Sequence, residues 1–162
     1  MHHEDVDPLP IVAGPLVLVV DDEFTPRSIV TRMVRGLGYP ARSCAGGRTA
    51  LRFLEAHPRE VRLLLADLAM PRMDGGELAE RARDLDPTLR IVLMAGAGDP
   101  HLDELLSGYR DLPFLGKPVS FGDLYDKLQD LLGTPARSPG YPPSMGPPAP
   151  RARRRTSGRH EV

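Results

Sequence analysis

Short apolar runs alternate with amphipathic segments over most of the chain. Five runs of four or five residues predict β-strands at 16–20, 41–45, 63–66, 91–94 and 113–116, the second of which is only weakly apolar. Apolar residues spaced three or four apart predict helices at 25–37, 49–56, 77–85, 102–106 and 120–132. Each predicted strand is therefore followed by a helix.

Capping residues mark the ends of two of these helices. Thr25 and Pro26 fit the N-cap and the first position of the first helix, and Gly38 is a suitable stop after it. Ser120 and Asp123 form a capping pattern at the start of the last helix. The expected inward faces are Ile29, Val30, Met33, Val34 and Leu37 in the first helix, Ala50, Leu51 and Leu54 in the second, and Leu124, Leu128, Leu131 and Leu132 in the last.

Strict alternation of strands and helices predicts a parallel sheet, because each crossover returns the chain to the same end of the sheet. Five such units between residues 15 and 133 predict an α/β fold of the flavodoxin-like type. We expect a doubly wound (βα)5 fold in three layers, with the strand order 2-1-3-4-5. Ligands of such sheets bind outside the carboxyl ends of the strands at the switch point, here between the first and third strands.

Composition divides the 162 residues into three parts. Residues 1–14 are expected to form a flexible segment, and residues 15–133 a single domain. Pro, Gly, Ser and Arg dominate residues 134–162, which leaves little apolar surface to bury and predicts disorder. This tail contains six Arg and one Glu, a net charge of +5, so the whole-chain charge of −1 leaves −6 for residues 1–133.

The basic tail could contact an acidic surface or nucleic acid. Its arginines at 151–155 lack interleaved aromatic residues and follow no folded nucleic-acid reader. A solvated tail is therefore the favoured interpretation.

Other features of the sequence disfavour membrane-spanning, secreted and metal–thiolate proteins. No apolar run approaches the roughly 20 residues of a membrane helix, so we expect no membrane span. The N-terminal MHHEDVDPLP lacks the basic and apolar regions of a secretory signal. The single Cys44 cannot form an internal disulfide and has no metal-ligand partner at a suitable spacing. A buried thiol in a reducing cytoplasm is the expected interpretation.

Charged residues stand where three of the apolar runs end. Asp21 and Asp22 follow the first predicted strand, Asp67 follows the third and Lys117 follows the fifth. Three carboxylates at one rim repel one another unless a cation compensates them, and oxygen ligands without His or Cys favour a hard ion such as Mg²⁺. With Asp67 as the nucleophile, and a metal and an ammonium to neutralise the transferred oxygens, such a rim is equipped to accept a phosphoryl group.

Any one of these acids could be an ordinary capping or loop residue. They occur in order, however, separated by 45 residues from Asp22 to Asp67 and by 50 from Asp67 to Lys117. The segments that hold them and the fourth strand, VVDDE, LLLADLAMPRMDGGEL, IVLMAGAGD and FLGKPVS, closely resemble the receiver domain of two-component response regulators. The resemblance covers about residues 15–133 and implies a CheY-like receiver. Residues 134–162 are too short and too polar to form an output domain, so we expect a stand-alone receiver. The second segment is the most specific, because it joins Asp67 to the family's turn Met70-Pro71-x-x-Asp74-Gly75.

The resemblance implies a role for each residue at the rim. Asp67 would accept a phosphoryl group from a phosphohistidine of a sensor histidine kinase or a phosphotransfer protein. Asp22, Asp67 and the backbone carbonyl of Ala69 would bind Mg²⁺, with Asp21 contributing directly or through water. Lys117 would bond a phosphoryl oxygen, and its peptide bond to the following proline would be cis, as in the family.

The chain departs from the family at the switch. Family members usually carry Thr or Ser at the end of the fourth strand, where this chain has Ala95, and the neighbouring Gly96 and Ala97 offer no hydroxyl either. Phe114 occupies the aromatic switch position without a phenol hydroxyl and could equally be a core residue. Losing one neutral hydrogen bond costs roughly 0.5–1.5 kcal/mol, so phosphorylation can persist while coupling to a partner changes.

Three functions remain open. The favoured one is a Mg²⁺-dependent phosphoaspartate receiver, a signalling domain without turnover of a separate substrate, whose region 100–129 contacts a downstream protein. The second is a degenerate receiver that binds its partner whatever its phosphorylation state, for which Ala95 is the argument. The third is a phosphohydrolase, but such enzymes commonly place a general acid two residues after the nucleophile, where Ala69 stands.

Overall fold

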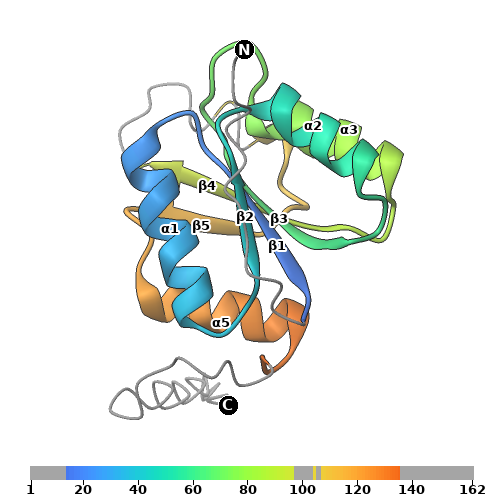
Figure 1. Ribbon diagram of the computed structural model, residues 1–162. Helices are drawn as coiled ribbons and strands as arrows, with labels where there is room; N and C mark the ends of the chain where they lie inside the picture. Colours follow the sequence, from blue (N-terminus) through green and yellow to red (C-terminus); the bar gives the residue numbers. More distant parts are fainter. Residues whose placement is uncertain (1–13, 97–103, 105–106, 136–162) are drawn as a thin grey trace, which may run out of the picture.

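The computed structural model describes residues 14–96, 104 and 107–135 of the chain (Figure 1). Five parallel strands form one sheet with the order β2-β1-β3-β4-β5, which confirms the predicted fold. The strands are β1 (Leu16–Val20), β2 (Ala41–Cys44), β3 (Val61–Asp67), β4 (Arg90–Gly96) and β5 (Phe114–Lys117). The helices among the described residues include α1 (Phe24–Gly36), α2 (Gly47–Ala56), α3 (Gly75–Leu85) and α5 (Phe121–Leu132).

The sheet is the middle of three layers. Helices α1 and α5 cover one face and α2 and α3 cover the other (Figure 1). Residues of β1 alternate between these two sides, since Val17 and Val19 belong to the cluster under α1 and α5 whereas Leu18 and Val20 belong to the one under α2 and α3. All four are fully buried, as expected for a strand covered on both faces.

Helix α1 begins two residues earlier than the capping pattern predicted, at Phe24 rather than at Pro26. Glu23 is its N-cap residue, and the first helical hydrogen bond runs from the Arg27 amide to the Glu23 carbonyl. The prediction of Thr25 as the N-cap was therefore wrong. Pro26 is tolerated in the first turn because amides there have no helical partner to lose. Gly38 follows the helix with a φ of +90°, in the left-handed region that glycine adopts readily, as expected of a stop.

The inward faces of the helices agree with the pattern, apart from two residues. Ile29 was expected to face inward but is 52% exposed, because the buried strip of α1 is narrower and centres on Val30 and Val34. Phe53 in α2 is buried although it was not assigned to the inward face. At the start of α5, the Ser120 hydroxyl accepts a hydrogen bond from the Asp123 amide at 3.1 Å, which confirms the predicted cap.

Some expectations from the sequence fall outside the described residues. These are the N-terminal segment up to residue 13, nearly all of the helix at 102–106 and the tail from residue 136. Within the described part, no helix is long and apolar enough to cross a membrane. Cys44 is fully buried at the end of β2, and burial raises the pKa of its thiol to about 12, which agrees with its interpretation as a buried thiol.

Candidate functional site

Three carboxylates meet where β1 and β3 end. The two strands are neighbours in the sheet, with Val20 in register with Ala66, so the residues that follow them share one rim. One carboxylate oxygen from each of Asp21, Asp22 and Asp67 lies within 4.8 Å of the others. Asp21 and Asp67 are buried, while Asp22 is exposed. The structure thus brings together the three acids that the sequence placed at strand ends.

Lys117 reaches this rim from the far side of β4. It is the last residue of β5 and is in register with Gly96 at the end of β4. The Nζ atom lies 3.0 Å from Asp21 Oδ2 and 3.3 Å from Asp67 Oδ1. One ammonium group therefore bridges the two buried carboxylates. The peptide bond from Lys117 to Pro118 is cis, as the family resemblance implied.

Asp21 is held from two sides. Its Oδ1 accepts a hydrogen bond from the Glu23 amide at 2.9 Å, while Lys117 donates to Oδ2. The Arg27 side chain donates to the Asp21 backbone carbonyl at 2.8 Å. Sequence reasoning missed Arg27, although a cation near the N-terminus of a helix is unfavourable for the helix dipole and is a signal that the side chain has another role.

The electrostatics of the site favour an additional cation. Burial raises the pKa of Asp67 to about 6; Lys117 opposes this shift, and the negative charge of Asp21 adds to it. Burial alone would lower the pKa of Lys117, but its hydrogen bond to Asp21 and the charge of Asp67 raise that pKa above its ordinary value. A single ammonium group thus faces three carboxylates, and an all-oxygen donor set with excess negative charge suits a divalent hard ion.

The turn after β3 is packed tightly against the residue that carries the central carboxylate. A Cβ atom at Gly75 would lie 2.3 Å from the Asp67 carbonyl oxygen, so any larger residue there forces backbone atoms apart. The Gly75 amide donates to the Leu68 carbonyl at 2.9 Å, and the Leu68 amide donates to the Met94 carbonyl at 2.8 Å. Asp74 caps α3 by accepting from the Glu77 amide. The start of α3 is thereby fixed against the end of β3.

The remaining positions singled out from the sequence lie around this rim. Ala69 is exposed two residues after Asp67, and the role of its carbonyl as a metal ligand stays a prediction. Ala95 is half-buried near the end of β4, and both it and Phe114 pack against the hydrophobic cluster under α2 and α3. This packing supports the core role for Phe114. Ala97 lies outside the described residues.

The comparisons with known proteins identify the class. The family model described as "Response regulator receiver domain" matches residues 17–129, and the chain belongs to this family. It is therefore a receiver domain of two-component phosphorelay signalling, and receiver domains are signalling modules rather than classical enzymes.

Particular relatives agree with this assignment. The chain is similar to the response regulator receiver protein CpdR of Brucella abortus, with 32% identity over 72% of this chain and 95% of CpdR. It is also similar to the sensor kinase CckA of Brucella abortus, with 29% identity over 72% of this chain but only 12% of CckA. Among solved structures, Vibrio cholerae chemotaxis protein CheY4 matches with a TM-score of 0.64 and 25% identity, over 74% of this chain and all of that one.

Proposed function

We propose that this protein is a Mg²⁺-dependent phosphoaspartate receiver in which Asp67 is the phosphoacceptor. The observation that carries this proposal is the bridge from Lys117 to the buried carboxylates of Asp21 and Asp67, at 3.0 Å and 3.3 Å. An ammonium group in this position can neutralise a phosphoryl oxygen once Asp67 is phosphorylated. Family membership supports this assignment.

The oxygen ligands at the rim fit Mg²⁺. Asp22, Asp67 and the Ala69 carbonyl would hold the ion, and Asp21, which already accepts two hydrogen bonds, would contribute directly or through water. When bound, Mg²⁺ would neutralise negative charge on the carboxylates and on the incoming phosphoryl group. The exposed Asp22 leaves one side of the cluster open to solvent for this purpose.

The proposed transfer makes one bond and breaks one. A carboxylate oxygen of Asp67 attacks the phosphorus of a phosphohistidine, forming an acyl phosphate as the phosphorus–nitrogen bond breaks. The departing imidazole nitrogen keeps the electron pair and takes a proton. Lys117 holds the buried acids in position and then contacts the transferred group. The donor would be a sensor histidine kinase or a phosphotransfer protein, in agreement with the similarity to part of the sensor kinase CckA.

A degenerate receiver is the second candidate, and Ala95 is the observation that favours it. Its side chain has no hydroxyl to bond a phosphoryl oxygen, and it packs against the hydrophobic cluster instead. Such a protein would bind its partner whatever its phosphorylation state. Downstream contact through the region 100–129 belongs to both candidates; in its described part, Phe121 at the start of α5 is 36% exposed.

Intact-mass spectrometry with acetyl phosphate separates the two candidates. We expect the wild type to gain one phosphoryl group with Mg²⁺ and none after chelation with EDTA, and Asp67→Asn to gain none under either condition. Asp84→Asn, at an exposed position of α3, is the matched control and should behave as the wild type. A folded wild type that never gains the group would favour the degenerate receiver.

We also propose that the receiver domain ends near residue 133, in a cytoplasmic protein. The buried Tyr39 supports this boundary, because its hydroxyl donates a hydrogen bond of 2.5 Å to the Gly133 carbonyl and ties the end of α5 to the start of β2. Removing residues 134–162 should leave the melting transition in place. Loss of that transition would contradict the boundary. A solvated tail stays the favoured interpretation, and any contact of its arginines with nucleic acid would involve residues outside the described ranges.

A further inference from the structure

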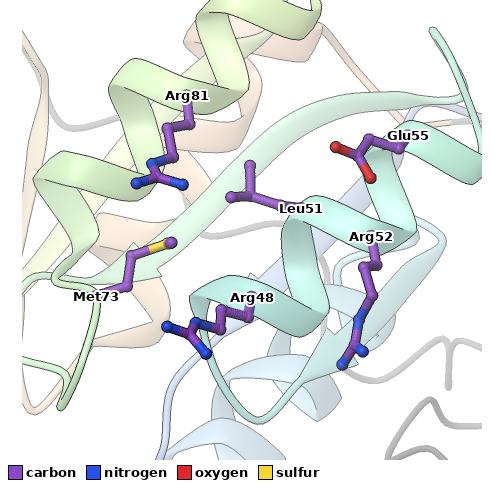
Figure 2. A pocket seen from close by; sticks show the side chains of 6 residues that line it. All are labelled: Arg48, Leu51, Arg52, Glu55, Met73 and Arg81. Atoms are coloured by element: carbon purple, nitrogen blue, oxygen red, sulfur yellow. The ribbon is translucent and has the colours of Figure 1, made fainter.

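A groove between α2 and α3 combines an apolar floor with a rim of arginines. It has a volume of about 560 Å³ (Figure 2). Leu51 and Met73 lie between the charged side chains. Helix α2 contributes Arg48, Arg52 and one acidic residue, Glu55, and α3 contributes Arg81 (Figure 2). The site proposed above uses none of these six residues.

The groove continues toward the carboxylate cluster. A second hollow, of about 210 Å³, shares Arg48, Arg52 and Met73 with the first and is also lined by Arg72 and Asp22. The two hollows are therefore neighbours along α2. We call them together the arginine trough and define it by Arg48, Leu51, Arg52, Arg72, Met73 and Arg81.

The arginine trough carries positive charge that ion pairs among the described residues neutralise only in part. Arg48, Arg52 and Arg72 are all exposed, and no ion pair joins them to another described residue. Arg81 pairs with Glu77 at 2.8 Å, and this pair is open to solvent. Residues 1–133 together carry a net charge of −6, so the positive charge is concentrated locally on an otherwise acidic domain.

We propose that the arginine trough binds an acidic peptide segment of a partner protein. An apolar side chain of that segment would pack on Leu51 and Met73, and its carboxylates would pair with Arg48 and Arg52. Guanidinium groups suit this role because they bind carboxylates through two parallel hydrogen bonds. Methionine adapts its shape to different apolar partners. This interface goes beyond the proposed phosphoryl transfer and lies across the sheet from α1 and α5.

Two features of the trough favour a peptide over nucleic acid. A nucleic-acid backbone carries negative charge along its whole length and would extend from the trough onto the rest of this acidic domain, whereas a short acidic peptide can lie within the trough. The trough also has no aromatic side chain on which a base could stack, and its floor is aliphatic and thioether in character.

The test uses the full chain and a fluorescein-labelled probe peptide in which Leu residues alternate with pairs of Asp and Glu. Fluorescence anisotropy should show saturable binding that weakens with salt, and a matched peptide with Asn and Gln should bind at least about tenfold more weakly. The double variant Arg48→Glu/Arg52→Glu should weaken binding about tenfold or more. Arg32→Glu, an exposed arginine of α1, should leave it unchanged.

Further variants distinguish loss of the peptide site from misfolding and from loss of the phosphoacceptor. The milder Arg48→Gln/Arg52→Gln should also lose affinity while keeping the wild-type melting temperature. Leu51→Ser should weaken binding of the acidic peptide, because it removes part of the apolar floor. Asp67→Asn should bind the probe as the wild type does, so failure of the trough and failure of the phosphoacceptor assignment are separate results.

Several outcomes would overturn the proposal. One is the absence of saturable binding of the acidic peptide. Another is an equal loss of affinity in the Arg32 variant and in the double variant. A third is displacement of the labelled peptide by a single-stranded oligonucleotide at a lower concentration than by the unlabelled peptide. A last variant tests whether the acidic N-terminal segment of this chain is itself the occupant of the trough. If Glu4→Gln/Asp5→Asn/Asp7→Asn increases probe affinity, the N-terminal segment of this chain is the occupant and the partner assignment is wrong.

Discussion

Replacement of Asp67 by Asn is expected to stabilise the metal-free protein at neutral pH. Burial raises the pKa of this carboxyl group from an ordinary 3.8 to about 6, even with Lys117 at 3.3 Å. A raised carboxyl pKa means that the folded state favours the protonated form. The associated stability is therefore complete below about pH 4 and is lost as the pH rises through about 6. Asn resembles the protonated acid and avoids the cost of ionisation.

The size of the effect follows from the shift. Each pKa unit corresponds to about 1.4 kcal/mol, so a shift of about two units sets an upper limit of roughly 3 kcal/mol. Solvent at the rim screens part of this energy, since the neighbouring Asp22 is exposed. We therefore expect Asp67→Asn to increase the free energy of unfolding by about 1–2 kcal/mol at neutral pH, and by much less near pH 4.

Urea unfolding in EDTA, with wild type and variant compared at each pH, measures this difference directly. Subtracting the two curves cancels the other titrating groups. Asp84→Asn, in an exposed position, serves as the control and should change stability by less than about 0.5 kcal/mol. Adding Mg²⁺ should stabilise the wild type and not the Asp67 variant. A variant less stable than the wild type in EDTA at neutral pH would show that ionised Asp67 does not destabilise the folded protein.

Three further predictions follow from the packing. Lys117→Met should destabilise the metal-free protein by about 2–3 kcal/mol, because it leaves the buried Asp21 carboxylate without its counter-charge. An unchanged midpoint of urea unfolding would contradict this. Gly75→Ala should cost about 1–3 kcal/mol and reduce phosphorylation by acetyl phosphate, since its Cβ meets the carbonyl oxygen at the end of β3. Its control, Gly36→Ala, has open space and should be neutral or slightly stabilising. Cys44 should react with a thiol reagent only upon unfolding, because burial raises its pKa to about 12; rapid labelling of the native protein would contradict its placement.

The sheet could be predicted because most of its strands are short continuous apolar runs, as expected of strands that helices cover on both faces. The helices were harder to delimit, since their ends depend on single hydrogen bonds. The Glu23 amide donates to the Asp21 side chain, and α1 begins directly after this turn, so Thr25 never becomes the cap. Ile29 keeps the helical spacing of the buried residues but lies just outside the strip that the sheet covers.

The acids and the lysine of the candidate site could be located from the sequence because each stands where a parallel strand ends. The ion pairs and close contacts that set the energetics of the site could not be predicted from the sequence. The bridging position of Lys117 between Asp21 and Asp67 depends on the strand order and on the small residues at the end of β4. The contact between Gly75 and the Asp67 carbonyl is likewise a property of the folded turn. The arginine trough was not foreseen, since its residues come from two helices and a loop that the sequence does not place side by side.

The switch position links the structure to the choice between the two candidate functions. Ala95 offers no hydroxyl, yet Lys117 and the three carboxylates remain in place. Because a metal and an ammonium group contribute more to binding a phosphoryl group than one neutral hydrogen bond, acceptance of that group should survive. The consequence of Ala95 is then expected in the coupling to a partner rather than in the chemistry.

The most direct test of the central claim is to identify the phosphorylated residue. The full-length protein is incubated with acetyl phosphate and Mg²⁺ and treated with borohydride, which reduces an aspartyl phosphate to homoserine. Tandem mass spectrometry of the peptides then locates that homoserine. We predict homoserine at position 67 and at neither Asp21 nor Asp22. Homoserine at another aspartate, or none in a folded and Mg²⁺-saturated protein, would contradict it.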